Sequence, residues 1–290
     1  MNVLITGVDG FIGRHASLSL AANHNVFGVA RQLPSAGAHP AVERIYADLS
    51  EPSFEKLLPA GIDCVIHLAQ SQKYRNFPEG AADMRCINVD ATCKLLEWSR
   101  KIGVKHFIFT STANVYGKTS ARMTETLAAN PESFYGASKL AAEILARQYQ
   151  AYFQVDILRL FTVYGPDQKS MLISNLIERV KSGGAIMLAQ GIGLYLTPIY
   201  VSDVVTAFEK LIEMPCGSSS GLFNVCGDEV LHLGEIVKAI ESAVNIKALT
   251  QHTDEIVPRF VGSNAALKEY LGLHQSTNIE SGLSLTVGSG

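Results

Sequence analysis

The 290-residue sequence lacks any run of 18 or more apolar residues, which argues against a transmembrane helix. Its start enters a strand-like pattern at Asn2 without a basic stretch and a cleavage site, so we expect no secretory signal. The formal net charge is only −3, which gives no electrostatic reason to expect nucleic acid or a membrane surface as a partner. We therefore expect a cytoplasmic protein.

Cysteine is also scarce. The five cysteines are odd in number, and none shows the Cys-x-x-Cys spacing typical of zinc sites. We interpret them as reduced thiols and expect no metal. What remains is an ordinary globular composition, with 47% apolar and 18% charged residues in a chain long enough for one large or two modest domains.

A glycine-rich stretch follows directly after a short apolar run at residues 2–6 and leads into a helical pattern. Glycines allow a tight turn and a close approach to a pyrophosphate, and the N-terminus of the next helix faces that negative charge. The alternative is a set of glycines that only form a turn. Because strand, turn and helix occur in this order, we predict a dinucleotide site with Gly7, Gly10, Phe11, Ile12 and Gly13.

The end of the second predicted strand, residues 25–30, lacks the acidic residue that holds the ribose 2′-hydroxyl in NAD-binding proteins. It reads Ala30-Arg31 instead. Arg31 can pair with a 2′-phosphate, which favours NADP over NAD. The alternative for Arg31 is a solvated surface side chain.

Further short apolar runs at residues 43–47, 62–68, 104–110 and 155–160 alternate with helical patterns at 81–102 and 134–152. This alternation predicts an α/β fold, a Rossmann doubly wound parallel sheet. After Gly165 the alternation weakens, which indicates a smaller α/β lobe. We place a dinucleotide domain at 1–165, with about 198–212 returning to it, and an interleaved substrate lobe at 166–290. From about Thr286 the chain looks unstructured.

The residues that carry chemistry lie around the fifth strand and the helix after it. The strand delivers Ser111 and Thr112, and the helix delivers Tyr135 and Lys139 on one face, four residues apart. An ammonium near a phenol favours the phenolate, so Tyr135 can exchange a proton with a hydroxyl or carbonyl group. Thr112 or Ser111 can bond the same oxygen. Tyr-x-x-x-Lys alone is common on solvated helix faces, and the glycine turn is what favours catalysis.

Together these motifs resemble the extended short-chain dehydrogenase/reductases, the NAD-dependent epimerase/dehydratase family, over nearly the whole chain. Residues 111–117, STANVYG, are similar to its S-[ST]-x-x-V-Y-G signature. Residues 158–166 are similar to its R-x-x-N-V-Y-G-P element, with Thr162 in place of asparagine, and residues 199–204 resemble its I-x-V-x-D-V helix start. The family also implies a homodimer formed through the helices of about 81–102 and 134–152.

The resemblance assigns the site residues. Thr112, Tyr135 and Lys139 take the catalytic positions. Beyond the glycine turn and Arg31, the cofactor side comprises Asp48, Leu49, Leu68, Ala69, Gln70, Asn88, Ser111, Tyr135 and Lys139. The substrate side comprises Thr112, Asn114, Thr162 and Arg259.

The family implies hydride transfer at a hydroxyl or keto carbon of a nucleotide-activated sugar. The acidic pair that dehydratases carry after the catalytic hydroxyl is Ala113-Asn114 here, so elimination is not expected. Arg31 tilts the prediction toward an NADP-linked ketosugar reductase, with an NAD-dependent 4-epimerase as the alternative. The family's diphosphate-binding arginine is absent from residues 194–198, which leaves a reductase of non-sugar carbonyls open, as well as a non-catalytic dinucleotide sensor.

Overall fold

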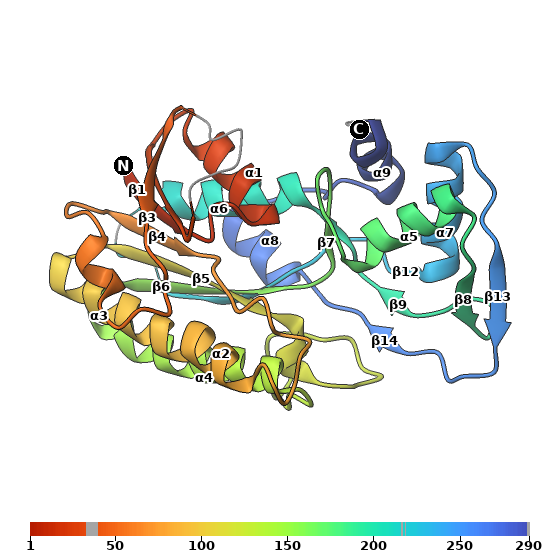
Figure 1. The fold of residues 1–290 in the computed structure, drawn as a ribbon, viewed down its shortest axis with the longest axis horizontal. Coiled ribbons are helices and arrows are strands. Elements are labelled where there is room, and N and C mark those ends of the chain that lie inside the picture. Colours follow the sequence, from red (N-terminus) through yellow and green to blue (C-terminus); the bar gives the residue numbers. More distant parts are fainter. Residues whose placement is uncertain (33–39, 216, 218, 289–290) are drawn as a thin grey trace. The chain divides into compact units, whose positions relative to one another are not determined.

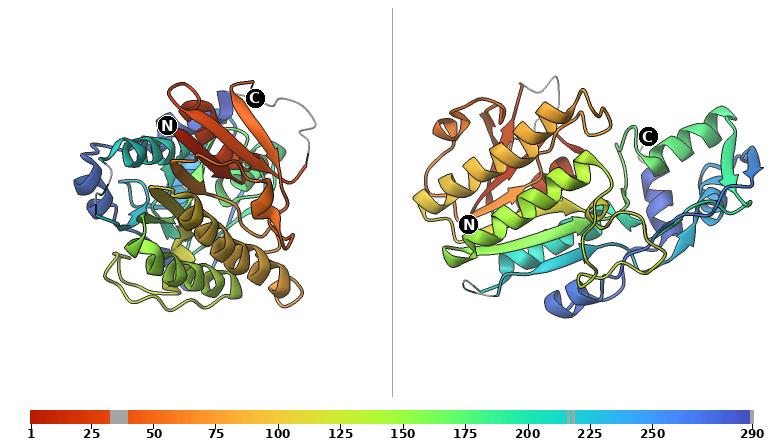
Figure 2. Two further views of the ribbon diagram at one scale, coloured as in Figure 1. Left: turned by 90° about the vertical axis from the view of Figure 1, so that its left-hand side faces the viewer. Right: turned by 90° about the horizontal axis from the view of Figure 1, so that it is seen from below.

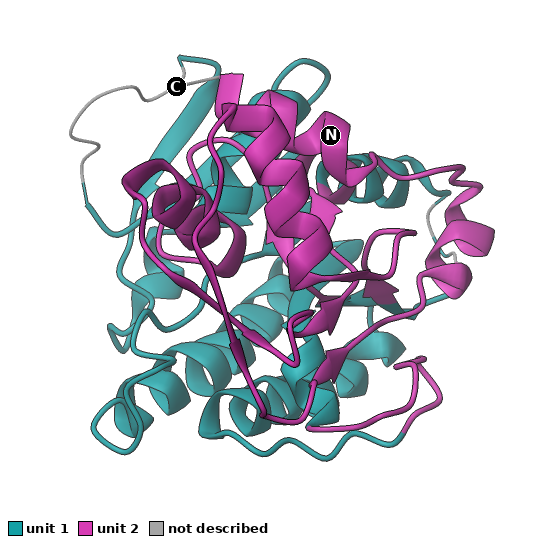
Figure 3. Cartoon of the chain, turned by 90° about the vertical axis from the view of Figure 1, so that its right-hand side faces the viewer, with its two compact units in different colours: residues 1–117, 128–159, 205–223 teal, residues 118–127, 160–204, 224–290 magenta. Residues whose placement is uncertain are grey.

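The computed structural model describes residues 1–32, 40–215, 217 and 219–288. Backbone packing divides the chain into two compact units (Figure 3). Unit 1 comprises residues 1–117, 128–159 and 205–223, and unit 2 comprises 118–127, 160–204 and 224–290. The chain therefore passes repeatedly between the units. The domain boundary near residue 165 stays a prediction.

Unit 1 is organised around a seven-stranded sheet in the order β11-β6-β5-β4-β1-β2-β3 (Figure 1). Each of the pairs β3·β2, β2·β1, β1·β4 and β4·β5 is parallel. The strands β4 and β5 are buried along their whole length, as expected for a sheet covered on both faces. The predicted Rossmann-type parallel sheet is thereby confirmed. The strands are β1 (Asn2–Thr6), β2 (Asn25–Ala30), β3 (Val42–Tyr46), β4 (Cys64–His67), β5 (His106–Thr112), β6 (Gln154–Leu160) and β11 (Leu222–Val225).

Helices cover both faces of this sheet. Helices α1 (Phe11–Leu20) and α6 (Val201–Glu213) lie on one face, and α3 (Ala91–Ile102) and α4 (Phe134–Arg147) lie on the other (Figures 1 and 2). Helix α4 begins where the Ser133 side chain accepts a hydrogen bond from the Gly136 N–H at 3.0 Å. Short 3₁₀ turns complete the unit at η1 (Phe54–Leu57), η3 (Ala113–Tyr116) and η4 (Gln148–Ala151).

The helix predicted at 81–102 is not a regular α-helix. It consists of α2 (Ala81–Arg85), one π turn η2 (Cys86–Asp90) and α3. A π turn inserts one extra residue into the helix and is frequent at functional sites. Here it contains Asn88, which is 1% exposed.

Unit 2 is more irregular, with three small sheets, β10-β7, β12-β9-β14 and β13-β8. The chain was expected to be unstructured from about Thr286, but helix α9 (Ile279–Gly288) continues to Gly288. Gly282 lets α9 approach Tyr164, since a Cβ there would lie 2.1 Å from the phenol oxygen. Its strands are β7 (Val163–Tyr164), β8 (Ile186–Ala189), β9 (Tyr195–Leu196), β10 (Ile199–Tyr200), β12 (Leu231–His232), β13 (Thr250–Thr253) and β14 (Arg259–Phe260), and its other helices are α5 (Leu172–Ser182), α7 (Leu233–Val244) and α8 (Ala265–Leu271).

No helix in the part of the chain that the structure describes is long and apolar enough to cross a membrane. Four cysteines, Cys64, Cys86, Cys93 and Cys226, are free thiols. Among the described residues, no histidines, cysteines and carboxylates are grouped so that three or more could hold a metal ion.

A buried ion pair joins α4 to the sheet of unit 1. Glu143 is fully buried, and its two carboxylate oxygens accept hydrogen bonds from Arg159 of β6 at 3.0 and 2.7 Å. The Arg159 guanidinium also lies 4.6 Å from the centre of the Tyr116 ring. This two-bond geometry is the strongest form of a carboxylate–guanidinium contact. Glu143 is four residues beyond Lys139, so the pair fixes the helix turn that carries the lysine.

Replacing Arg159 by leucine should therefore destabilise unit 1 strongly. The change removes the two-bond partner of the buried Glu143 carboxylate and leaves Arg147, 3.8 Å away, as a weaker one, which costs about 3–5 kcal/mol. The double variant Glu143→Leu/Arg159→Leu should recover much of this loss because neither charge of this pair is left buried. Chemical denaturation measures both. Equal losses in the single and double variants would show that the two charges are not coupled.

Candidate active site

The glycine turn between β1 and α1 is shaped by close backbone contacts. Gly7 has a φ of +70°, and its oxygen accepts a hydrogen bond from the Gly10 N–H at 2.9 Å. A Cβ on Gly13 would lie 2.2 Å from the Gly7 oxygen, so no larger residue fits there. No side chain caps the N-terminus of α1, and no acid stands in its first turn, the turn of Phe11 and Ile12. This arrangement suits an anionic ligand at the helix N-terminus.

Two neighbouring strands complete the predicted cofactor site. Leu68 and Ala69 follow β4 and pack against the turn, where a Cβ on Gly7 would lie 2.9 Å from the Ala69 nitrogen. Ser111, near the end of β5, is 4% exposed, and within the described residues its hydroxyl oxygen has no hydrogen-bond partner. An unpaired buried hydroxyl is unfavourable by about 1–3 kcal/mol, so it needs a reason. A polar ligand atom would supply its partner, and a dinucleotide therefore fits these residues.

The adenine end of the predicted site carries charges of both signs. Asp48 accepts hydrogen bonds from the Ser50 backbone N–H and hydroxyl at 2.9 and 2.7 Å. The backbone bond from Ser50 is the main cause that lowers the pKa of Asp48, and the charge of Arg31 adds to it. Arg31 is exposed, whereas Leu49 is buried. The arginine therefore shares its surroundings with a carboxylate, which the sequence pattern did not show.

Four side chains from separate elements meet at the predicted acid–base site. Tyr135, in the first turn of α4, donates a hydrogen bond to the Gln70 side-chain oxygen at 2.7 Å. The nearby Thr112 hydroxyl acts to lower the pKa of Tyr135. The Thr112 oxygen in turn accepts the backbone N–H and the side-chain amide of Asn114 at 3.2 and 3.0 Å. Thr112 and Tyr135 are thus brought together. Asn114 and Gln70 enter as their direct partners.

Lys139 lies one helical turn beyond Tyr135 and is 2% exposed. Its ammonium nitrogen lies 4.3 Å from the centre of the Phe109 ring. Burial lowers the pKa of Lys139 to about 7, and the charge of Glu143 opposes this change. Near neutral pH the lysine is therefore held close to its midpoint of protonation, where small changes in its surroundings alter its charge.

The pKa of Tyr135 moves opposite to the direction expected from its spacing to Lys139. Burial raises this pKa, the Thr112 hydroxyl opposes the rise, and Tyr74 adds to it. The Tyr74 and Tyr135 rings are 5.3 Å apart. The expectation assumed a permanent ammonium, whereas burial acts against the charged form of both residues. The protein's own groups therefore favour the neutral phenol.

His67 has a structural role, as its place within an apolar strand suggested. It is 1% exposed, and burial lowers the pKa of His67 to about 3. Its Nδ1 lies 2.6 Å from the Thr6 hydroxyl, and its Nε2 lies 3.0 Å from the Thr92 hydroxyl. Because Thr92 donates its own hydrogen to the Asn88 carbonyl oxygen, Nε2 must carry the ring hydrogen. His67 is thus a neutral link between β1 and α3.

Asn88 connects the cofactor side to the catalytic helix. Its side-chain oxygen accepts the Ser71 N–H at 2.9 Å, and its amide donates to the Ser138 hydroxyl at 2.9 Å. Ser138 donates to the Tyr135 carbonyl oxygen at 2.8 Å. Both polar ends of Asn88 are thus used by the protein, and direct contact with a cofactor stays a prediction. These partners are far apart in sequence, which is why the pattern showed no sign of this role.

The predicted substrate residues Thr162 and Arg259 belong to unit 2. Thr162 lies between β6 and β7, and its backbone oxygen accepts the Ile199 N–H at 2.9 Å. Arg259 on β14 is paired in register with Tyr195, and its guanidinium lies 4.8 Å from the centre of that ring. Leu196, within the segment that lacks the family's arginine, is fully buried. The substrate roles of Thr162 and Arg259 stay predictions.

Comparison with known proteins extends these observations to the whole chain. The family model described as "NAD dependent epimerase/dehydratase family" matches residues 3–226. An uncharacterized UDP-glucose epimerase, YtcB of Bacillus subtilis (strain 168), is 29% identical, with 98% of this chain and 96% of that protein covered. A GDP-6-deoxy-D-mannose reductase of Pseudomonas aeruginosa is 30% identical, with 84% of this chain and 81% of that protein covered.

Solved structures show the same likeness. MoeE5 in complex with UDP-glucuronic acid and NAD is 29% identical, with a TM-score of 0.86 and coverage of 99% of this chain and 98% of that one. The UDP-glucuronic acid 4-epimerase from Bacillus cereus, also in complex with UDP-glucuronic acid and NAD, is 25% identical, with a TM-score of 0.88 and the same coverage. Since the family model matches residues 3–226, well over half of the sequence, this chain belongs to the NAD-dependent epimerase/dehydratase family.

Proposed function

We propose that this protein is an NAD-dependent nucleotide-sugar 4-epimerase. The observation that carries the proposal is the placement of the Thr112 hydroxyl beside Tyr135, with Lys139 buried one turn further along α4. Together with the glycine turn, these residues form a site for proton exchange next to a dinucleotide. The sequence alone slightly favours a ketosugar reductase. The similarity to a UDP-glucuronic acid 4-epimerase and to MoeE5, both solved with NAD, favours the epimerase instead.

The protein's residues have separate tasks in this reaction. Tyr135 takes the proton from the sugar C4 hydroxyl as hydride leaves C4, and it returns a proton to the C4 carbonyl oxygen when hydride is added to the opposite face of C4. Thr112 donates a hydrogen bond to the same oxygen. Lys139 holds the nicotinamide ribose and supplies positive charge near Tyr135. When bound, NAD supplies the hydride acceptor and a positive ring that favours the phenolate.

The charges around Arg31 support NAD over NADP. A 2′-phosphate adds nearly two negative charges and needs an unopposed cationic partner. Arg31 acts electrostatically on Asp48, so part of its field is already offset by a carboxylate. An exposed arginine in that setting is a weak anchor for a second phosphate. NAD is therefore favoured over NADP, in contrast to the expectation from the sequence, and Arg31 is a solvated side chain.

Asn114 argues against elimination and for a simple proton exchange. It stands where dehydratases of the family carry a carboxylate, and its amide is bound to the Thr112 oxygen at 3.0 Å. An amide cannot remove a proton from carbon, so Asn114 cannot act as the base that elimination needs, and Tyr135 is left as the acid–base group of a simple proton exchange. A non-catalytic sensor would have no need for this ordering of Thr112.

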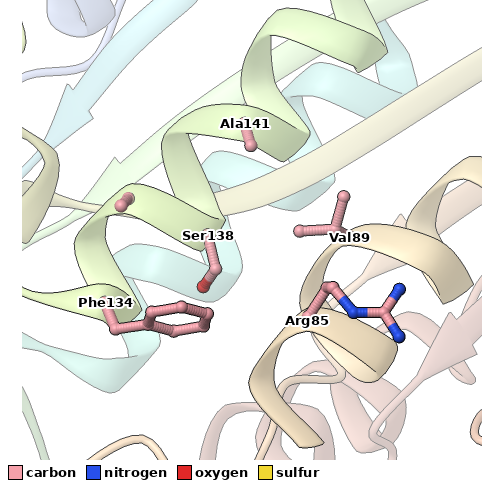
Figure 4. A pocket seen from close by; sticks show the side chains of 6 residues that line it. Arg85, Val89, Phe134, Ser138 and Ala141 are labelled. Carbon is pink, nitrogen blue, oxygen red and sulfur yellow. The ribbon is translucent and has the colours of Figure 1, made fainter. Parts of the chain in front are cut away.

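We also propose a homodimer that is formed through α4 and the segment before α3. Arg85, Val89, Phe134, Ala137, Ser138 and Ala141 line a groove between these elements (Figure 4). Ile144 continues the row of Ala137 and Ala141 at helical spacing and is 53% exposed. A mostly apolar groove beside an exposed isoleucine suits a second copy of the same helices.

Changing Tyr135 to phenylalanine should lower kcat by about 10²–10⁴-fold, because the proton has no other acceptor in place. NAD affinity should stay within a few-fold of the wild-type value, since the ring and its packing remain. Steady-state kinetics with UDP-glucose and UDP-glucuronic acid, together with NAD titration, measure both effects. Tyr152→Phe, at a 65% exposed tyrosine of the same unit, is the matched control. Wild-type turnover in the Tyr135 variant would overturn the assignment.

Denaturing the purified protein should release NAD in near-stoichiometric amount, because an epimerase recycles its cofactor in place. Chromatography of the released nucleotide and titration of the emptied protein with NAD and NADP check this. Arg31→Ala should leave the affinity for NAD within a few-fold. A protein that is purified empty, binds NADPH more tightly than NADH and loses this preference in the Arg31 variant would instead be a reductase.

Ile144→Glu should convert a dimer to a monomer, since it places a charge in an apolar contact. Sedimentation velocity at micromolar concentration measures the effect. Leu18→Glu, at a 47% exposed leucine of α1 on the other face of the sheet, is the control and should remain dimeric. Monomeric wild-type protein, or a dimer that persists in the Ile144 variant, would contradict this interface.

A further inference from the structure

The side-chain oxygen of Gln70 lies 2.7 Å from the Tyr135 phenol oxygen, although the two residues are 65 positions apart in the sequence. Gln70 follows β4 and is exposed, so no packing forces it onto the phenol. Tyr135 is the residue whose proton moves in the proposed reaction. A side chain that bonds its reacting atom therefore has a direct effect on that proton.

The direction of each hydrogen bond follows from the donors available. Thr112 accepts two hydrogen bonds from Asn114, at least one of them from a backbone N–H that can only donate. The hydroxyl hydrogen of Thr112 is therefore not used toward Asn114, and this hydroxyl acts to lower the pKa of Tyr135. The side-chain oxygen of Gln70 can only accept, so the single hydrogen of Tyr135 is directed to Gln70.

We infer that Gln70 is a further member of the acid–base group, which bonds Tyr135 in both of its protonation states. Its carbonyl oxygen accepts the hydrogen of the neutral phenol. After rotation about its terminal bond, its amide donates to the phenolate. No atom is transferred to Gln70, and the proton of Tyr135 goes to or comes from the substrate oxygen. This inference rests on the proposed role of Tyr135 as acid and base.

A glutamine that serves both states favours the charged one. Hydrogen bonds to a charged group are roughly twice as strong as those between neutral groups. Gln70 therefore lowers the pKa of Tyr135 relative to an apolar side chain, against the effect of burial. Among the described residues, the other titratable side chain that acts on Tyr135 is Tyr74. The guanidinium of Arg75 lies 5.1 Å from the Tyr74 ring centre, and Lys139 lies one turn further along α4. Tyr74, Arg75 and Lys139 stay unchanged in the variants that test the inference.

Gln70→Met and Gln70→Glu test the inference. Methionine has a similar length and forms neither bond, so the pKa of Tyr135 should rise by about 0.5–1 pH unit. Glutamate accepts from the phenol but cannot donate to the phenolate and adds negative charge, so the rise should be larger, about 1–2 units. Gln148→Met, at an exposed glutamine of η4, is the matched control and should leave the pKa unchanged.

Two readouts separate this inference from the proposed function. The first is the tyrosinate absorbance of NAD-loaded protein as a function of pH, with the titration of Tyr135→Phe subtracted, which needs no substrate. The second is the acidic limb of kcat against pH with UDP-glucuronic acid. Shifts in the first readout without any turnover would support Gln70 and reject the epimerase.

Two results would overturn the inference. If Gln70→Met weakens NAD binding while the titration of Tyr135 stays in place, Gln70 is a cofactor ligand only. If both variants leave the titration and NAD binding unchanged, the contact with Tyr135 has no chemical role. Thermal unfolding midpoints equal to the wild-type value confirm that the exposed substitutions have not altered the fold.

Discussion

The close placement of Thr112 and Tyr135 is the constraint on which the predicted site depends, because it brings the end of β5 to the first turn of α4. Each side is set by local chemistry. Thr112 accepts two bonds from Asn114 at the start of a 3₁₀ turn, and Ser133 caps α4 so that Tyr135 lies in its first turn. Two short capping motifs thus place Thr112 and Tyr135 within reach of each other, although they are 23 positions apart in the sequence.

Burial then decides the electrostatics. Burial lowers the pKa of Lys139 to about 7 and raises the pKa of Tyr135. Glu143 would favour a permanent ammonium, but Arg159 already binds both of its oxygens. The lysine is therefore left poised between its two charge states. A positively charged nicotinamide ring near Tyr135 would have its largest effect on the ionisation of the phenol at such a site, because the protein's own groups favour the neutral phenol.

The fold, and the placement of Tyr135 and Lys139 one turn apart on α4, were predictable because they depend on local patterns. Alternating apolar runs gave the parallel sheet, and four-residue spacing placed Tyr135 and Lys139 on one face. The contacts of Gln70 and Asn88 were not predictable, since their partners are 65 and 50 residues away and a π turn sets the orientation of Asn88. The direction of the Tyr135 pKa also depends on burial, which no spacing rule contains. Helix α9 was missed because its glycine, Gly282, serves a packing contact and does not break the helix.

The preference for NAD or NADP depends on the combined charge of Arg31 and Asp48 and not on one residue at a strand end. The dipeptide Ala30-Arg31 suggested a phosphate-binding arginine because an acid is missing from the end of β2. In the folded unit a carboxylate is nevertheless near that arginine, contributed by Asp48 after β3. The negative charge that is missing from the end of β2 is therefore supplied after the end of β3. What a 2′-phosphate would meet is the sum of both charges, so a single position in a strand is weak evidence for NADP whenever the neighbouring strand ends in an acid.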